Sequence, residues 1–130
     1  MRFHTAVNKF CWQAVMGQPL TVWKTAMDQK RPYLGVNDAV EAIKFIIDKD
    51  LFDCEIYNVV SSNNTVRDIV DSIRKSIPTI EVQMVESEIM NQLSYRVLSN
   101  KIVSKGFNCK DDIGNGVSET ISLLKHSYPR

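Results

Sequence analysis

The sequence lacks the residue patterns that build several common kinds of site. Only three cysteines occur among 130 residues, and no two of them form a C-x-x-C pair. That spacing supports neither a zinc site nor a thioredoxin-type redox motif. The histidines, His4 and His126, stand near opposite ends of the chain, so we expect no metal site. An odd number of dispersed cysteines is typical of free thiols in a reducing compartment, and we therefore expect a cytoplasmic protein.

Long apolar runs and an excess of one charge are also missing. No stretch approaches the ~20 apolar residues that cross a bilayer, so neither a membrane anchor nor a signal peptide is expected. Lys plus Arg number 16 and Asp plus Glu number 15, which gives a net charge of +1. This balance disfavours a nucleic-acid partner. With 44% apolar and 24% charged residues, the composition is that of a globular domain or of one lobe of a larger protein.

Hydrophobic periodicity predicts alternating helices and strands. Asp38 with Glu41, and Thr65 with Asp68, have the spacing of residues that begin a helix. The alternation predicts an α/β fold, or a small α+β-like lobe, with helices packed on a small, mainly parallel sheet. The predicted helices span 3–16, 38–49, 65–77, 100–105 and 116–126, the strands span 20–23, 55–60 and 80–85, and we predict a loop over 24–31, an extended return over 32–36 and a turn over 61–64.

The same periodicity predicts the core. Residues on the apolar faces of these helices and strands should be buried together. The predicted core residues are Val7, Ile43, Ile47, Tyr57, Val59, Ile69, Val70, Ile73, Val82, Ile121 and Leu124.

The motifs of a self-sufficient dehydrogenase are not found. Gly114-Asn115-Gly116 precedes a helix, but it has no preceding strand and no third glycine, both of which a dinucleotide site needs. No tyrosine is followed by a lysine four positions later. The adjacent carboxylates Asp111 and Asp112 suit a solvated turn better than a catalytic dyad. We predict no catalytic and no cofactor-binding residue in this chain.

Arg31 and Trp23 are the best candidates for ligand binding. Arg31 lies on the predicted loop that follows the strand ending at Trp23. A guanidinium near an aromatic ring suits a ligand that carries a phosphate and a planar ring. Spacing alone leaves the alternatives open, since Arg31 can be a solvated charge and Trp23 can serve packing.

Several segments, taken in order, resemble the C-terminal half of the NAD-dependent epimerase/dehydratases. These are the extended short-chain dehydrogenase/reductases that act on nucleotide sugars. The segments that carry the resemblance are Pro19–Trp23, Gln29–Leu34, Val36–Ile43, Tyr57–Val59 with the helix begun by Thr65, Ser94–Val97, Lys101, Gly106–Phe107 and the helix that follows Gly116.

The resemblance implies that residues 1–130 form one substrate-binding lobe for a nucleotide-diphosphate sugar. It matches Arg31 to an arginine that contacts the diphosphate and Trp23 to an aromatic residue near the base, and it adds Val22 and Gln29 as substrate-binding candidates. Where the family often has a second arginine, Gln92-Leu93 stand. The NAD-binding Rossmann lobe would precede Met1, so the resemblance implies a truncated, catalytically incomplete chain.

A second interpretation is a non-catalytic interaction or oligomerisation module derived from the same fold. The apolar residues of the predicted first helix occupy more than one face, which a small sheet cannot cover completely. We therefore expect the missing Rossmann lobe, or a second copy of the chain, to cover them. The apolar residues concerned are Phe3, Val7, Phe10, Cys11, Trp12 and Val15.

Overall fold

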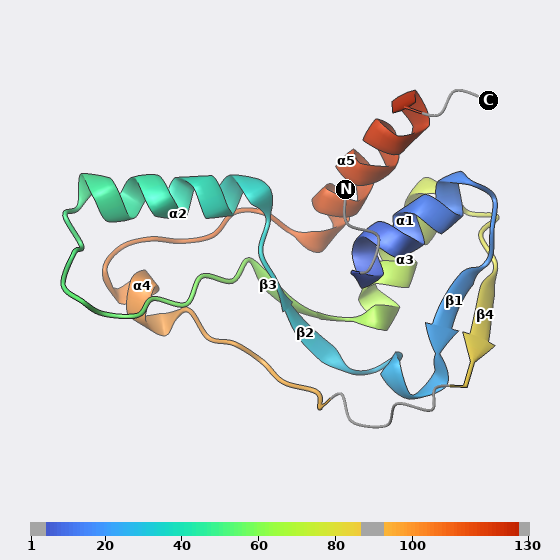
Figure 1. Ribbon diagram of the computed structural model, residues 1–130, viewed down its shortest axis with the longest axis horizontal. Helices are drawn as coiled ribbons and strands as arrows, with labels where there is room; N and C mark the ends of the chain where they lie inside the picture. The colour runs from blue at the N-terminus through green and yellow to red at the C-terminus, as the bar shows by residue number, and fades with distance from the viewer. Residues whose placement is uncertain (1–4, 87–92, 128–130) are drawn as a thin grey trace.

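The computed structural model describes residues 5–86 and 93–127, and it places helices around two short pairs of strands (Figure 1). The predicted α/β class is confirmed. Phe3, His4 and Gln92, which the sequence analysis singled out, lie outside the described residues. In chain order the elements are α1 (Ala6–Val15), β1 (Leu20–Trp23), the 3-10 helix η1 (Lys24–Ala26), β2 (Lys30–Tyr33), α2 (Val36–Asp48), β3 (Ser62–Thr65), α3 (Val66–Ser76), β4 (Val82–Val85), α4 (Asn100–Ser104) and α5 (Ile113–Ser127).

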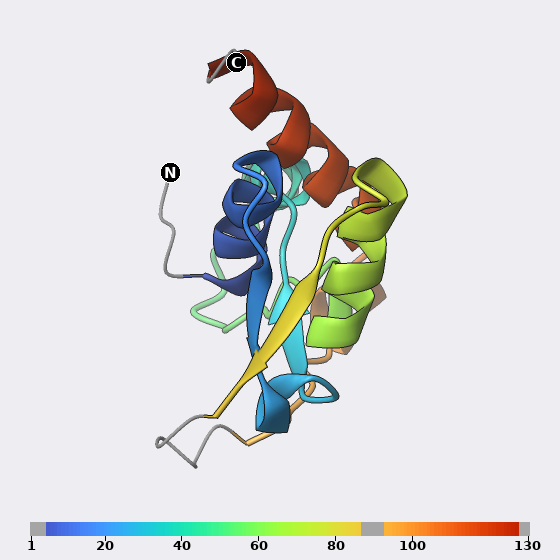
Figure 2. The same ribbon diagram turned by 90° about the vertical axis from the view of Figure 1, so that its right-hand side faces the viewer.

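The strands pair in two ways. β1 and β4 run parallel, with Leu20 opposite Val82, and Figure 2 shows them side by side. This pair fits the predicted mainly parallel sheet, and the crossover from β1 to β4 contains the helices α2 and α3. β2 and β3 form a second, antiparallel pair, with Lys30 opposite Thr65.

The main core lies between α1, α3, α5 and β1. Burial is confirmed for the predicted core residues of α3 and α5, whereas Val7 and Val82 are half-buried against the same cluster. Of the apolar residues expected to need a partner on the first helix, Phe10 and Cys11 are buried within the chain, and Val7, Trp12 and Val15 pack half-buried against the same cluster. The buried residues of this cluster are Phe10, Cys11, Ala14, Leu20, Val22, Ile69, Val70, Ile73, Val117, Ile121 and Leu124.

A second, smaller core joins α2 to α4. Ala42, Ile102 and Phe107 are buried together, and Tyr57 and Val59 pack against them half-buried. Figure 1 shows α2 and α4 on the left, apart from the three helices of the main core.

The predicted burial of Ile43 and Ile47 is wrong. Both side chains are more than half exposed. The face of α2 that carries Ala42 and Phe45 meets this small core instead, with the Phe45 and Phe107 ring centroids 5.4 Å apart.

Two local predictions fail because strand formation depends on a partner. Residues 55–60 have strand composition, but no strand of the described chain pairs with them. Residues 61–64 were expected to turn, yet Ser62–Thr65 form β3 because β2 lies beside them. The expected loop over 24–31 contains η1 and the start of β2.

The helix starts show one confirmed and one incorrect prediction. Thr65 begins α3 with a capping box: its hydroxyl accepts from the N–H of Asp68 at 3.1 Å, and the Asp68 carboxylate accepts from the N–H of Thr65 at 2.7 Å. Asp38 is not the N-cap of α2, because that helix begins two residues earlier, after Gly35. Gly35 approaches Asp111 so closely that an added Cβ would lie 2.0 Å from its Oδ2.

Asp38 is a buried carboxylate that connects three segments. It accepts hydrogen bonds from the Ser61 hydroxyl at 2.6 Å and from the N–H groups of Lys110 at 2.8 Å and Asp111 at 3.0 Å. Burial favours its neutral form, but these hydrogen bonds favour the carboxylate more, so the pKa of Asp38 is lowered. The neighbouring carboxylates also accept backbone hydrogen bonds: Asp111 accepts from the N–H of Asp38 at 3.2 Å, and Asp112 accepts from the N–H of Gly114 at 2.7 Å.

We predict that Asp38→Asn destabilises the fold by about 1–3 kcal/mol at pH 7, the scale of a buried polar group that loses its partners. Because folding lowers the pKa of Asp38 below the ~3.9 of an unfolded aspartate, its contribution is present above that pH and is lost as the pH falls through the folded pKa. Urea unfolding at pH 7 and pH 3 should show a difference between the two proteins that shrinks in acid. The exposed Asp48→Asn, on the same helix, is the control, and an effect of equal size there would contradict the assignment.

Candidate functional site

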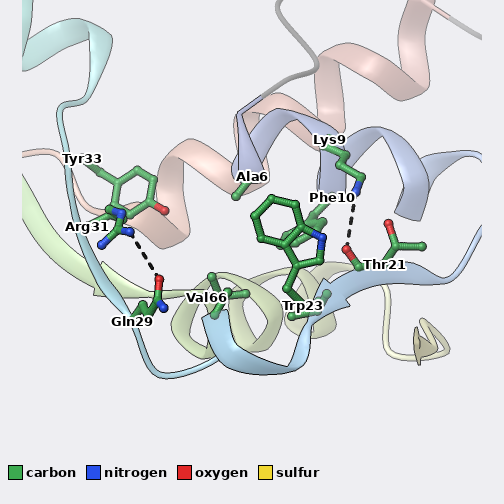
Figure 3. Close-up of a pocket in the computed structure, with 11 residues that line it drawn as sticks. Ala6, Lys9, Phe10, Thr21, Trp23, Gln29, Arg31, Tyr33 and Val66 are labelled. Carbon is green, nitrogen blue, oxygen red and sulfur yellow. Dashed lines mark hydrogen bonds between the residues drawn. The ribbon is translucent and has the colours of Figure 1, made fainter. Parts of the chain in front are cut away.

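A pocket of about 220 Å³ opens between α1, β1 and β2 (Figure 3). Every candidate named from the sequence, Val22, Trp23, Gln29 and Arg31, lies in its wall. The structure therefore brings together residues that stand on two different strands and the turn between them. The full lining is Ala6, Lys9, Phe10, Thr21, Val22, Trp23, Ala26, Gln29, Arg31, Tyr33 and Val66.

Strand β1 supplies one wall of the pocket. Leu20 and Val22 are almost fully buried in the main core, whereas Trp23 at the strand end is 38% exposed. The buried Gln13 of α1 fixes the strand, because its side-chain oxygen accepts from the N–H of Thr21 at 3.3 Å and its nitrogen donates to the Thr21 hydroxyl at 3.2 Å. These contacts tie β1 to α1 at Thr21, which itself lines the pocket.

Arg31 on β2 is held in place by several contacts. Its guanidinium donates to the Gln29 side chain at 3.3 Å, to the Lys30 carbonyl at 2.9 Å and to the Leu93 carbonyl. It also lies over the Tyr95 ring, 5.0 Å from the centroid. The residue is half-buried, so the alternative of a solvated loop charge does not describe it.

The segment at residues 93–95 runs beside β2 and completes this setting. The N–H of Lys30 donates to the Ser94 hydroxyl at 3.0 Å, and the N–H of Tyr95 donates to the Lys30 carbonyl at 3.3 Å. Arg31 therefore lies between residues 93–95 on one side and the pocket on the other.

Lys9 is a wall residue that the sequence interpretation missed. It lies on α1, where its ammonium donates to the Thr21 carbonyl at 3.5 Å and sits 5.9 Å from the Phe10 ring centroid. Figure 3 places Lys9 and Arg31 on opposite sides of Trp23. No sequence signal marks Lys9, since a single lysine beside the apolar face of a helix is an ordinary surface residue.

The pocket wall is cationic and aromatic. Among the described residues, Lys9 and Arg31 are its charged members, and no carboxylate of that part of the chain lines it. Burial raises the pKa of Tyr33, with the charge of Arg31 acting in the opposite direction. Cations at two ends and aromatic rings between them suit a ligand with anionic groups and a planar ring.

Other chemistry has little support in the described chain. Within residues 5–86 and 93–127 no group of three or more His, Cys, Asp or Glu side chains could hold a metal ion. Cys11 is a buried free thiol whose pKa burial raises to about 12, so it is not a nucleophile at neutral pH. Gly114 and Gly116 lie in the first turn of α5, with no strand leading into it. None of the described helices combines the length and hydropathy needed to span a bilayer.

The fold matches a class of solved enzymes. UDP-glucuronic acid 4-epimerase from Bacillus cereus, solved with a substrate analogue and NAD, superposes with a TM-score of 0.85 over 98% of this chain and 42% of its own, at 14% identity. UDP-glucose 4-epimerase from Thermus thermophilus, solved with NAD, gives 0.76 over 95% of this chain and 40% of its own, at 24% identity. The chain has the fold of the C-terminal part of extended short-chain dehydrogenase/reductases.

A curated relative is similar in sequence. The chloroplastic UDP-sulfoquinovose synthase of Spinacia oleracea is 34% identical over 76 residues, which is 57% of this chain and 16% of the synthase. No family model matches the sequence. The resemblance to the NAD-dependent epimerase/dehydratases is confirmed, and the chain spans about 40% of the length of their solved structures.

The hydrogen bonds of Gln13 to Thr21 should contribute to the stability of the fold next to the pocket. Gln13→Leu keeps the approximate size of the side chain but leaves the N–H of Thr21 without its acceptor, so we expect a loss of about 1–3 kcal/mol in the free energy of unfolding. The exposed Gln18→Leu, in the following turn, should change stability by less than about 0.5 kcal/mol. Chemical denaturation measures both, and equal effects would show that the Gln13 contacts to β1 do not stabilise the fold.

Proposed function

We propose that this chain is the substrate-binding part of an NAD-dependent sugar-nucleotide epimerase or dehydratase and is catalytically incomplete alone. The pocket carries the proposal, because a fold shared with such enzymes presents two cations and three aromatic rings at one concave site.

In this proposal the pocket holds the nucleotide-diphosphate end of the substrate. Arg31 binds the diphosphate through its planar fork, which matches phosphate oxygens. Gln29 orients Arg31, since its side-chain oxygen accepts from the guanidinium. Trp23 lies against the base, and Val22 forms the apolar floor beside it.

Lys9 is proposed as the second positive charge of the site. The family's second arginine is replaced by Gln92-Leu93 in this sequence, and of these two the described Leu93 offers only its carbonyl, which Arg31 uses. Lys9 lines the same pocket, and Figure 3 shows the Trp23 ring between it and Arg31. In this proposal Lys9 adds a second positive charge to the setting of the anionic end of the ligand.

The size of the pocket supports the incompleteness of the chain. At about 220 Å³ it is smaller than the ~300–1,000 Å³ of complete small-molecule sites. A nucleotide-diphosphate sugar therefore exceeds it, and the sugar end would extend beyond this chain toward another lobe.

The residues of this chain do not fit an NAD site. A dinucleotide site needs a glycine-rich turn between a strand and a helix, whereas Gly114 and Gly116 lie inside α5. In the parent family NAD supplies the hydride acceptor, so the chain alone lacks that part of the chemistry.

We predict that UDP-glucose raises the melting temperature of this chain, because a ligand selective for the folded state stabilises it. Arg31→Ala should weaken the binding of UDP-glucose by about 10- to 150-fold, or ~1.5–3 kcal/mol. Lys9→Ala should weaken binding in a salt-dependent manner, and Trp23→Ala should weaken it with less dependence on salt. Arg74→Ala, an exposed arginine of α3 paired with Asp71 at 3.5 Å, is the control. Unchanged affinity in Arg31→Ala would show that the diphosphate site is misplaced.

We further predict no dehydrogenase activity and no measurable NAD binding by the isolated chain. The reason is the absence of a glycine fingerprint and of a Tyr-x-x-x-Lys pair in the sequence. Calorimetric titration with NAD checks this, and a micromolar dissociation constant would overturn it.

A further inference from the structure

Residues 93–97 run beside the strand pair β2–β3, and polar contacts rather than apolar burial hold them there. Leu93 is 81% exposed and Tyr95 is 52% exposed. The first part of the segment is attached to β2, where the N–H of Lys30 donates to the Ser94 hydroxyl at 3.0 Å and the Tyr95 N–H donates to the Lys30 carbonyl at 3.3 Å. Solvent-exposed hydrogen bonds open readily, so these two bonds alone hold the segment weakly.

Asn63 of β3 holds the other end of the segment. Its side-chain nitrogen donates to the Val97 carbonyl at 2.9 Å, and its side-chain oxygen accepts from the Val97 N–H at 2.9 Å. One planar amide thus satisfies both backbone groups of the same residue, as a neighbouring strand would. Both bonds are partly buried, whereas the bond between Lys30 and Ser94 is exposed. Asn63 is therefore the firmer anchor of residues 93–97.

The anchored segment supports the Arg31 guanidinium. The guanidinium donates to the Leu93 carbonyl and lies over the Tyr95 ring, 5.0 Å from its centroid. Tyr95 is two residues from Val97, so a displacement of the segment at Val97 moves the ring that lies against Arg31. Asn63 is not among the described residues that line the pocket, so its influence on a ligand passes through this segment.

The order of the guanidinium matters because arginine is a long side chain with many rotamers. Ordering such a side chain at the moment of binding costs free energy, and a side chain that is ordered beforehand avoids that cost. The planar fork of arginine also matches phosphate oxygens only in a defined orientation. The contacts with Leu93 and Tyr95 supply that orientation before a ligand arrives.

We propose that Asn63 is a positioning residue for the ligand site: it holds residues 93–97 along β2 and thereby keeps the Arg31 guanidinium ordered for an anionic ligand. The inference rests on the proposed function, because it concerns the binding of a nucleotide-diphosphate sugar at the same pocket. Asn63 touches no ligand in this arrangement and acts through Val97 and Tyr95.

The first test uses NMR on the ligand-free chain. An aromatic ring shifts the signals of protons above its face upfield, so the side-chain signals of Arg31 should lie upfield of those of a solvent-exposed arginine. Asn63→Ala should move them to the exposed position and should make amide exchange at Tyr95 and Val97 at least about tenfold faster. The Trp12 indole signal, which reports on the main core, should stay in place if the variant folds.

Asn63→Asp is the conservative variant, because its carboxylate still accepts from the Val97 N–H but cannot donate to the Val97 carbonyl. It should give an intermediate shift of the Arg31 signals, and it decides the question if Asn63→Ala does not fold. Asn58→Ala is the matched control, since it removes an exposed asparagine from the segment that leads to β3, and it should leave the Arg31 signals unchanged. Arg31 signals that stay in place in the Asn63 variants overturn the inference.

The second test is calorimetric titration with UDP-glucose. Asn63→Ala should weaken binding by about tenfold, and it should cause no further loss in a chain that already carries Arg31→Ala, because residues that act through one another are not additive. Tyr95→Leu, at an exposed position, should reproduce the loss. A purely structural role of Asn63 predicts the same fold-change with and without Arg31, and that result also overturns the inference. If the parent chain does not bind UDP-glucose, the proposed function fails, and the Arg31 signals of the ligand-free chain alone decide this inference.

Discussion

Strand β1 is held in place by the burial of Leu20 and Val22, and this strand forms one wall of the pocket. Both side chains lie in the main core between α1, α3 and α5, and parallel pairing with β4 fixes the direction of the strand. Gln13 then ties the backbone and hydroxyl of Thr21 to α1. With the strand fixed at both faces, Trp23 at its end is placed beside the cations of the wall rather than in the core.

The molecule consists of two packing units with different degrees of completion. The unit around α1, α3 and α5 has a closed core and carries the pocket, whereas the unit around α2 and α4 has a small core and an uncovered outer face. Asp38, Ser61 and the backbone at Lys110 and Asp111 connect the second unit to the start of α5. The chain spans about 40% of the length of the solved structures on which it superposes, and the unit around α1, α3 and α5 carries the pocket.

Hydrophobic periodicity and helix caps correctly predicted the elements whose conformation depends on neighbouring residues in the sequence. They failed for segments whose conformation depends on pairing with a strand that is distant in the sequence. The helix begun by Thr65 has both a capping pair and a strong apolar stripe, so its sequence is sufficient. Three of the four residues Ser62–Thr65 are serine or asparagine, which seldom form strands, and the segment is β3 because Lys30–Tyr33 lie alongside. Residues 55–60 show the reverse case, since their composition suits a strand but the described chain gives them no partner.

The same distinction applies to the site. Arg31 and Trp23 could be predicted from a strand followed by a cationic segment, and the resemblance added Val22 and Gln29. Lys9 could not be predicted, because its place in the wall results from the packing of α1 against β1 and no local pattern records it.

The account rests on ligand binding at the pocket between α1, β1 and β2. The most direct measurement is a titration of ¹⁵N-labelled chain with UDP-glucose, followed by NMR at backbone amides and at the indole N–H groups. The account predicts that the Trp23 indole and the amides of Thr21, Gln29 and Arg31 shift together along one binding curve, while the Trp12 indole and the amides of α4 stay in place. Shifts that cluster away from this pocket, or none up to millimolar ligand, would contradict it.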